Sequence, residues 1–182
     1  MIIETERLTM RPLTIEDAPD VQRLLNDPTV AAQLPAVPYP LPEGGAEEWI
    51  RSATEDATFA CVERAENAFG GIVALHLEPG NRAQLGGWCG EPWRHNGYAV
   101  EAMHAAVRYG YEVLGLTTIY ALRKGRLWIA PRDFADRRLP FRHSPDEWHI
   151  LEQAGEESSR LPAPMAAIGR KTARLRRLFV RS

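Results

Sequence analysis

The hydrophobic and polar positions near the start of the chain change from the period of a strand to that of a helix. Residues 6–12 alternate polar and apolar side chains, which predicts a half-buried strand. Thr14 and Asp17 then form a capping-box pattern with Asp in place of Glu, and apolar residues follow at helical spacing. We therefore predict a first helix that ends at about Asn26, in which Pro19 is tolerated because it lies near the first turn.

The next stretch, residues 35–45, holds four prolines and two glycines, which predicts a loop. A second helix is expected over residues 47–54, and from Thr58 the period changes to that of strands. Three consecutive antiparallel strands are predicted, joined first by a short polar connection and then by a turn; they span residues 58–64, 69–78 and 83–89.

A central helix is predicted to begin near Tyr98 and to be ended by Gly115. Its apolar stripe is expected to consist of Ala99, Ala102, Met103, Ala106, Val107 and Val113. A strand over residues 116–122 follows. Beyond it we predict a short strand at 127–129, a helix at 145–154 with Ser144 as its N-cap, and a last strand within 174–181.

Length and composition indicate a single globular domain. The 182 residues suffice for one domain with a full apolar core, and the content of 45% hydrophobic and 25% charged residues is near the average of soluble folds. No apolar run approaches the roughly 18 residues that span a bilayer, and the acidic N-terminus does not resemble a signal peptide. We therefore expect a cytoplasmic protein in which Cys61 and Cys89 are free thiols, with no metal site.

The net charge of −2 hides an uneven distribution. Residues 1–120 hold 8 Lys and Arg against 17 Asp and Glu, whereas residues 121–182 hold 14 against 7. Such asymmetry can mark a nucleic-acid surface, but aromatic and basic residues do not interleave as in a single-strand binding groove. Over nucleic-acid binding we favour two regions of one domain that attract each other or face solvent, and a polyanionic cofactor would use part of the positive charge.

The segment with the clearest candidate chemistry is residues 94–99, between a predicted strand and the start of the central helix. Free backbone N–H groups and the positive end of the helix dipole favour a phosphate or pyrophosphate there. Gly97 lets the backbone approach a ligand closely, and Arg94 adds a fixed positive charge. Taken alone, the segment fits a tight turn with a solvated arginine equally well.

Arg94, Gly97 and Ala99 stand at the positions of a Q/R-x-x-G-x-G/A motif, and with it the chain resembles the GNAT superfamily of acetyl-CoA-dependent N-acetyltransferases. Three further segments are similar to the branch that acetylates the N-termini of ribosomal proteins: residues 4–13, 38–40 and 97–102. The resemblance implies a mixed α/β fold, with a mainly antiparallel, twisted sheet of six or seven strands that is split in the middle and has helices on both faces. Residues 123–143 are atypical, as an insertion or an altered segment of the single N-acetyltransferase domain.

The resemblance also implies how acetyl-CoA binds. Strand 83–89 is expected to carry a bulge, permitted by Gly86 and Gly87, to splay from the strand that follows the helix, and to pair its exposed backbone with the pantetheine arm. The expected cofactor-binding residues are Trp88, Cys89, Gly90, Arg94, His95, Asn96, Gly97, Tyr98 and Ala99. For Trp88, a plain core aromatic is an equally good interpretation.

The implied reaction is direct attack of a neutral primary amine on the thioester. An α-amine with a pKa of ~7.7 is neutral far more often near pH 7 than a lysine at ~10.4, so protein N-termini and small-molecule amines are the easier acceptors. Tyr39 is expected at the acceptor mouth, although a proline-rich surface turn explains it almost as well. The sequence leaves the acceptor and the oligomeric state open, with a homodimer among the alternatives.

The catalytic groups depart from the family pattern. Gln84 stands where many members of the branch carry a glutamate, and an amide cannot accept a proton at useful pH. The block that supplies an acid for the departing thiolate is matched either by residues 144–156 or by a segment that begins at Asp136. We take Gln84 and Ser144 as the catalytic positions, with a weak or inactive GNAT-fold protein that binds CoA or acyl-CoA, as a sensor or interaction module, as the alternative.

Overall fold

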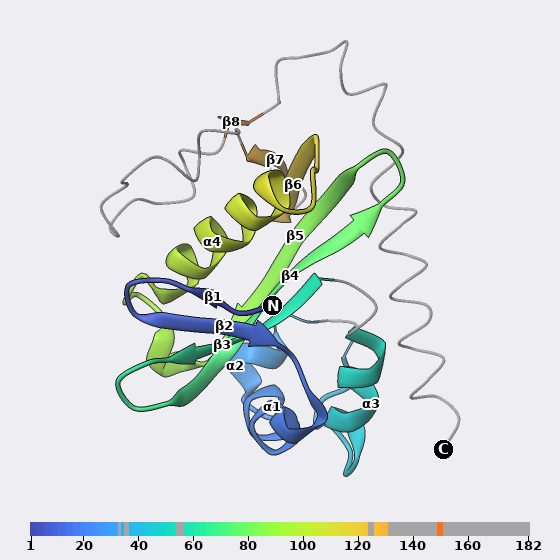
Figure 1. The fold of residues 1–182 in the computed structure, drawn as a ribbon. Coiled ribbons are helices and arrows are strands. Elements are labelled where there is room, and N and C mark those ends of the chain that lie inside the picture. Colours follow the sequence, from blue (N-terminus) through green and yellow to red (C-terminus); the bar gives the residue numbers. More distant parts are fainter. Residues whose placement is uncertain (33, 35–36, 54–56, 124–125, 131–148, 151–182) are drawn as a thin grey trace.

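The computed structural model describes residues 1–32, 34, 37–53, 57–123, 126–130 and 149–150 (Figure 1). Eight strands form one sheet in sequence order, so each strand pairs with its neighbours along the chain. The strands are β1 (Ile3–Glu4), β2 (Leu8–Pro12), β3 (Ala57–Glu63), β4 (Ala68–Glu78), β5 (Arg82–Cys89), β6 (Thr118–Arg123), β7 (Arg126–Ala130) and β8 (His149–Ile150). The helices are α1 (Ala18–Leu25), α2 (Pro28–Ala31), α3 (Gly45–Ala53) and α4 (Tyr98–Glu112).

The sheet is antiparallel except at one place. β5 and β6 run parallel, because α4 carries the chain back along the sheet between them. This mixed, mainly antiparallel sheet confirms the predicted fold: among the described residues, six longer strands agree with the predicted six or seven, and the two-residue strands β1 and β8 extend the sheet at either edge. The hairpin β3–β4 and the turn into β5 lie where the sequence predicted them.

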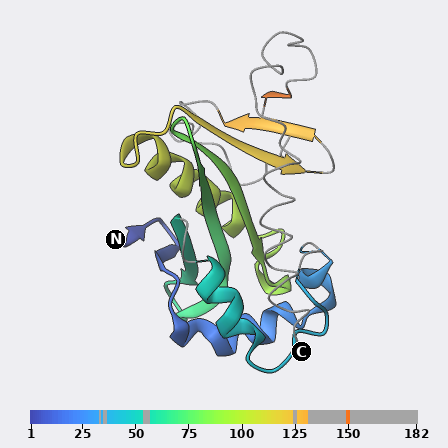
Figure 2. The ribbon, with the colours of Figure 1, turned by 90° about the vertical axis from the view of Figure 1, so that its right-hand side faces the viewer.

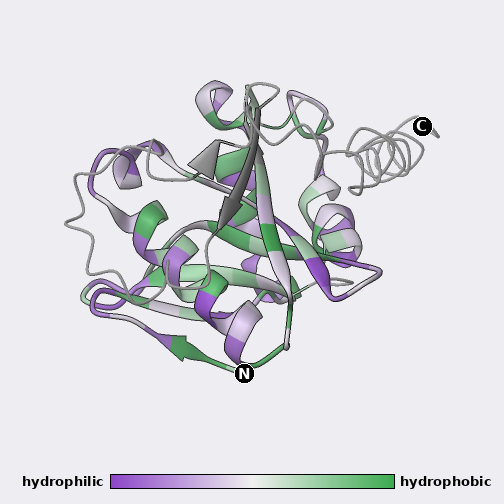
Figure 3. Ribbon diagram, turned by 90° about the horizontal axis from the view of Figure 1, so that it is seen from above, coloured by the Kyte–Doolittle hydropathy of each residue, from purple (hydrophilic) through white to green (hydrophobic). Residues whose placement is uncertain are grey.

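Helices cover both faces of the sheet and divide the apolar core into two layers (Figures 1 and 2). α4 packs on one face, where Ala106 and Val107 meet Leu75 and Leu85 of the central strands. α1, α2 and α3 cover the other face; their buried partners on the sheet are Ala60, Val62, Phe69, Ile72 and Trp88. Alternate residues of a strand point to opposite faces, so the continuously buried β3 and β4 supply both layers. The hydropathy colouring of Figure 3 shows the same arrangement, with apolar green along the strands and mixed colours on the helices.

The first predicted helix is confirmed, and its capping residue has a second role. The helix starts with a short 3₁₀ turn at Ile15–Asp17 before α1. The Asp17 carboxylate accepts a hydrogen bond from the Thr14 N–H at 2.9 Å and binds both Nη atoms of Arg11 at 2.6 and 2.9 Å. Asp17, itself buried, therefore ties the start of the helix to β2 through an ion pair with the partly exposed Arg11.

The expected bulge in strand 83–89 does not occur against β4. The β4–β5 register is continuous from Gly71 opposite Cys89 to Glu78 opposite Arg82, and the described irregularity lies instead in the β3–β4 pairing, where β4 has one extra residue, Gly70, opposite the step from Cys61 to Val62. Gly87 is needed there for a different reason: a Cβ at this position would lie 2.4 Å from the carbonyl oxygen of Ile72. Gly87 thus serves close contact with β4 and not a bulge, whereas a Cβ on Gly86 would lie 3.2 Å from the His76 side chain.

The predicted apolar stripe of α4 is right in its middle and wrong at both ends. Ala102, Ala106 and Val107 are buried, whereas Ala99 is exposed and the Val113 side chain is 54% exposed. The terminal turns of α4 contact the core through other residues, Tyr98 at the start and Gly110 near the end. Glu101, a charged residue that periodicity assigns to solvent, is buried instead.

The C-terminal part is described only in short pieces. The predicted strand at 127–129 is confirmed as β7. The helix predicted over 145–154 is wrong at its centre, because His149 and Ile150 pair with β7 as β8; strand pairing overrides the local helix-start signal. Ser144, the alternative block at Asp136, and the last strand predicted within 174–181 lie outside the described residues.

Candidate functional site

The parallel pair β5–β6 separates after three residue pairs. Arg82, Ala83 and Gln84 of β5 face Thr118, Ile119 and Tyr120 of β6, and no pairing follows. Figure 2 shows β6 turning away from the long strands β4 and β5. Among the described residues, the edge of β5 from Leu85 to Cys89 therefore has no strand beside it, and its backbone groups are available to a ligand.

A short loop anchored in the core follows the open edge of β5. The Gly90 N–H donates to the Gly70 carbonyl at 2.9 Å, and a 3₁₀ turn at Glu91–Trp93 turns the chain back. Trp93 lies directly over Gly70, where a Cβ would come within 1.7 Å of the indole ring. This contact fixes the base of the loop while its tip, at His95 and Asn96, stays exposed.

The loop ends in a left-handed turn that presents backbone N–H groups at the start of α4. His95 has φ +63° and Gly97, the N-cap of α4, has φ +79°. Within the described part of the chain, the Gly97 N–H donates to no acceptor, and the first N–H groups of a helix lack intrahelical partners. Arg94 lies beside them and its Nη2 reaches the Cys89 carbonyl at 3.5 Å. Such a turn can hold a diphosphate, and the open edge of β5 next to it can hold an extended arm.

The predicted cofactor residues do not all present their side chains to this site. Trp88 is 6% exposed and packs against Trp49 and Phe69 with ring centroids 6.0 and 6.4 Å apart, so its side chain lies in the core layer of α1 and α3. Cys89 is half-buried, and burial raises the pKa of its thiol although Arg94 opposes the rise. Tyr39, between α2 and α3, is 54% exposed. This exposure fits both a position at the acceptor mouth and a proline-rich surface turn.

A polar cluster that the sequence analysis missed lies on the α1–α3 face of the sheet, where β5 and β6 separate. The Tyr120 hydroxyl donates to Glu78 Oε1 at 2.7 Å, and Arg82 Nη2 lies 4.0 Å from Glu78 Oε2. By register, Gln84 shares this face and lies directly opposite both Tyr120 on β6 and His76 on β4. The place where the family carries a glutamate therefore has a carboxylate one strand away, because Tyr120 bridges β5 to reach Glu78.

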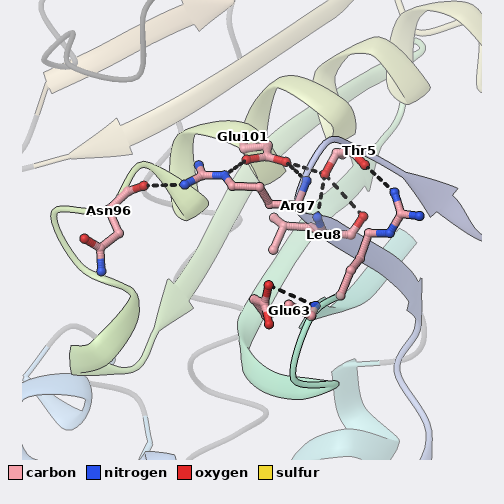
Figure 4. Close-up of polar contacts among 8 residues, drawn as sticks. Thr5, Arg7, Leu8, Glu63, Asn96 and Glu101 are labelled. Atoms are coloured by element: carbon pink, nitrogen blue, oxygen red, sulfur yellow. Dashed lines mark hydrogen bonds and ion pairs between the residues drawn. The ribbon is translucent and has the colours of Figure 1, made fainter.

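A second missed group joins the N-terminal segment to the cofactor loop (Figure 4). The buried Glu101 carboxylate accepts hydrogen bonds from the Thr5 hydroxyl at 2.5 Å, the Arg7 N–H at 2.8 Å and Arg7 Nε at 2.7 Å. Arg7 also donates from Nη1 to the Asn96 carbonyl at 2.8 Å and lies over the Tyr98 ring at 4.3 Å. The sequence signal that could have revealed this group is Glu101 itself, an acidic residue in the first turn of a helix, next to a predicted anion site that its charge would oppose unless it is paired.

Neither a side-chain cluster for a metal nor a membrane-spanning helix occurs in the part of the chain that the structure describes. The residues that the structure describes contain no group of three or more His, Cys, Asp or Glu side chains that could hold a metal ion. In the same residues, no helix is long and apolar enough to cross a membrane.

The sheet thus opens beside a glycine turn and the N-terminus of α4. The sequence matches the Acetyltransferase (GNAT) domain family over residues 7–124. The chain belongs to this family of acetyl-CoA-dependent N-acetyltransferases, and its fold is the GNAT fold.

Solved structures agree with this assignment. A GNAT-family acetyltransferase from Bacillus anthracis is 24% identical with a TM-score of 0.60, over 66% of this chain and 72% of that one. A putative ribosomal-protein-serine acetyltransferase from Vibrio cholerae is 26% identical with a TM-score of 0.58, over the same shares. The microcin C7 self-immunity acetyltransferase MccE, solved with acetyl-CoA and AMP, is 12% identical with a TM-score of 0.54, over 64% and 69%. No curated protein matches the chain closely enough to count as a relative.

Proposed function

We propose that this GNAT-family protein transfers the acetyl group of acetyl-CoA to a primary amine by direct attack, and that a protein N-terminus or a small-molecule amine is the acceptor. The observation that carries the proposal is the opening between β5 and β6, which runs directly into the turn at Gly97. In this proposal the turn and Arg94 bind the diphosphate. The backbone of β5 from Leu85 to Cys89 pairs with the pantetheine arm, and Trp88 contributes its backbone only.

The acceptor would approach from the face that carries the polar cluster, since α4 covers the other face. We assign Glu78 as the group that takes the amine proton through water, because Gln84 cannot accept it. The Tyr120 hydroxyl donates to Glu78, and Arg82 lies near it, so the carboxylate is held as an acceptor. Removal of a general base typically costs ~10²–10⁴-fold in rate.

Release of free CoA with a panel of amines tests the activity. The panel comprises peptides with N-terminal serine or alanine, the same peptides with a blocked N-terminus and one lysine, and polyamines. Turnover is expected with free N-termini and not with the lysine-only peptides, because an α-amine is neutral at a lower pH. The polyamines, whose amines are about as basic as lysine, test for a small-molecule acceptor that is selected by its fit to the site and not by its pKa. The similarity to the putative ribosomal-protein-serine acetyltransferase from Vibrio cholerae supports the choice of peptides.

The variant Glu78→Gln tests the proton acceptor, with Glu66→Gln in the exposed β3–β4 connection as its matched control. We expect kcat to fall by roughly 10²-fold in the first variant and to stay unchanged in the second, with the same KM for acetyl-CoA in both. Gln84 is the observation that favours the alternative, a protein that binds CoA or acyl-CoA without turnover. Binding of CoA without release from acetyl-CoA for any amine would select that alternative.

A further inference from the structure

We propose that Arg7 is a positioning residue for the diphosphate of the acetyl donor, because it holds the Asn96 peptide in the orientation that presents the Gly97 N–H and neutralises Glu101 beside the site. The inference rests on the proposed function, which places the diphosphate at this turn. Arg7 lies 94 residues from Glu101 in the sequence, outside the loop that binds the ligand.

The first step of the argument is the geometry of one peptide. Arg7 Nη1 donates to the carbonyl oxygen of Asn96 at 2.8 Å, so this carbonyl points toward the N-terminal segment (Figure 4). In a planar trans peptide the carbonyl and the following N–H point in opposite directions. The N–H of Gly97 therefore points away from Arg7, toward the open side of the turn, where no described residue accepts it.

The second step concerns charge. Glu101 is 7% exposed and lies in the first turn of α4, and helical side chains lean toward the N-terminus of their helix. An uncompensated carboxylate there would oppose a diphosphate bound one turn away. The ion pair with Arg7, at 2.7 Å, removes this opposition while the backbone N–H groups stay free for the ligand.

The third step is that Arg7 itself is held in place. Its guanidinium lies over the ring of Tyr98, 4.3 Å from the centroid, and Tyr98 stacks on Trp93 at 4.7 Å. Trp93 in turn lies on Gly70 of β4. The turn therefore has contacts on two sides: Trp93 anchors it to the core, and Arg7 connects it to the N-terminal segment.

Calorimetry with the full chain tests the role of Arg7, with CoA and with pantetheine, which lacks the diphosphate. Arg7→Gln should weaken CoA by well over tenfold, because it loses the hydrogen bond to the Asn96 carbonyl, roughly a tenfold effect by itself, and also leaves the Glu101 carboxylate unpaired beside the diphosphate; pantetheine binding should be unchanged. Arg64→Gln is the matched control: Arg64 donates to the Thr5 carbonyl at 3.0 Å, on the same segment, without reaching the loop. This control should bind both ligands like the unaltered chain.

A double variant separates positioning from charge and from folding. Arg7→Met with Glu101→Gln removes the ion pair without leaving a buried charge, so the chain keeps its fold, and CoA binding should still be about tenfold weaker. Full CoA affinity in either variant, or an equal loss of CoA and pantetheine affinity, would overturn the positioning role. Absence of CoA binding by the unaltered chain would instead count against the proposed function.

Discussion

Gly97→Ala is the change that tests the left-handed turn at the cofactor site most directly. Gly97 has φ +79° and ψ −3°, a conformation that costs a residue with a Cβ about 1–2 kcal/mol. The neighbouring His95 and Asn96 are exposed, so the turn in the free variant can rearrange and relieve the strain. Binding of the diphosphate then has to restore the turn, and 1–2 kcal/mol corresponds to a loss of affinity of roughly 5–30-fold.

Calorimetric titration with CoA measures this loss, with thermal unfolding of the same samples as a check on the fold. Gly97→Asn is the matched control, because asparagine tolerates the left-handed region better than alanine, and it should lose much less affinity. Equal and large losses in both variants would mean that the site needs bare backbone and not a particular φ. Unchanged affinity together with unchanged thermal stability in Gly97→Ala would refute the reasoning altogether.

Three further changes test other parts of the structure. Burial raises the pKa of the Asp17 carboxyl, but hydrogen bonds from Arg11 and the Thr14 N–H outweigh it and lower the pKa, so its stabilisation is present above about pH 4 and lost below. Between about pH 6 and pH 3 the urea midpoint should therefore fall further in the unaltered chain than in Asp17→Asn, and equal falls contradict this. Trp88→Leu should cost a large part of the roughly 3–5 kcal/mol lost with a buried tryptophan and leave CoA affinity within about twofold; a large loss of affinity in a folded variant would return the ring to the cofactor site. In alkylation at about pH 8, Cys61 should stay unmodified because burial raises its pKa to about 12, and Cys89 should react slowly and be protected by CoA; labelling of Cys89 at equal rates with and without CoA would argue against an arm along β5.

The order of the elements could be predicted from local patterns because each pattern had a local cause. Alternation gave β2, the turn signals gave the β3–β4–β5 series, and Gly97 before an apolar stripe gave α4. The errors arose where a distant partner decides. Residues 149–150 join the sheet because β7 offers them backbone partners, and at the start of α4 it is Tyr98, not Ala99, that packs against the core.

The candidate site divides in the same way. The turn at 94–99 could be predicted because glycine, a helix start and an arginine are adjacent in sequence. The Tyr120–Glu78 and Arg7–Glu101 pairs could not, since 42 and 94 residues separate their members and only the folded sheet brings them together. Even the assignment of Trp88 depended on register, because a one-residue change of register would move its ring to the other face.

The pairs Arg7–Glu101 and Tyr120–Glu78 lie at different ends of the opening between β5 and β6 and should affect different steps of the reaction. Arg7 and Glu101 act at the diphosphate end, on the α4 side, and so affect how firmly the donor is held. Tyr120 and Glu78 act at the end where β5 and β6 still pair, on the α1–α3 face, and so affect how the amine loses its proton. Changes in the first pair should therefore alter KM for acetyl-CoA with little effect on kcat, and changes in the second pair should alter kcat with little effect on that KM. A GNAT domain that has glutamine at the usual position of the base can then remain a catalyst, because the sheet supplies a carboxylate from the adjacent strand.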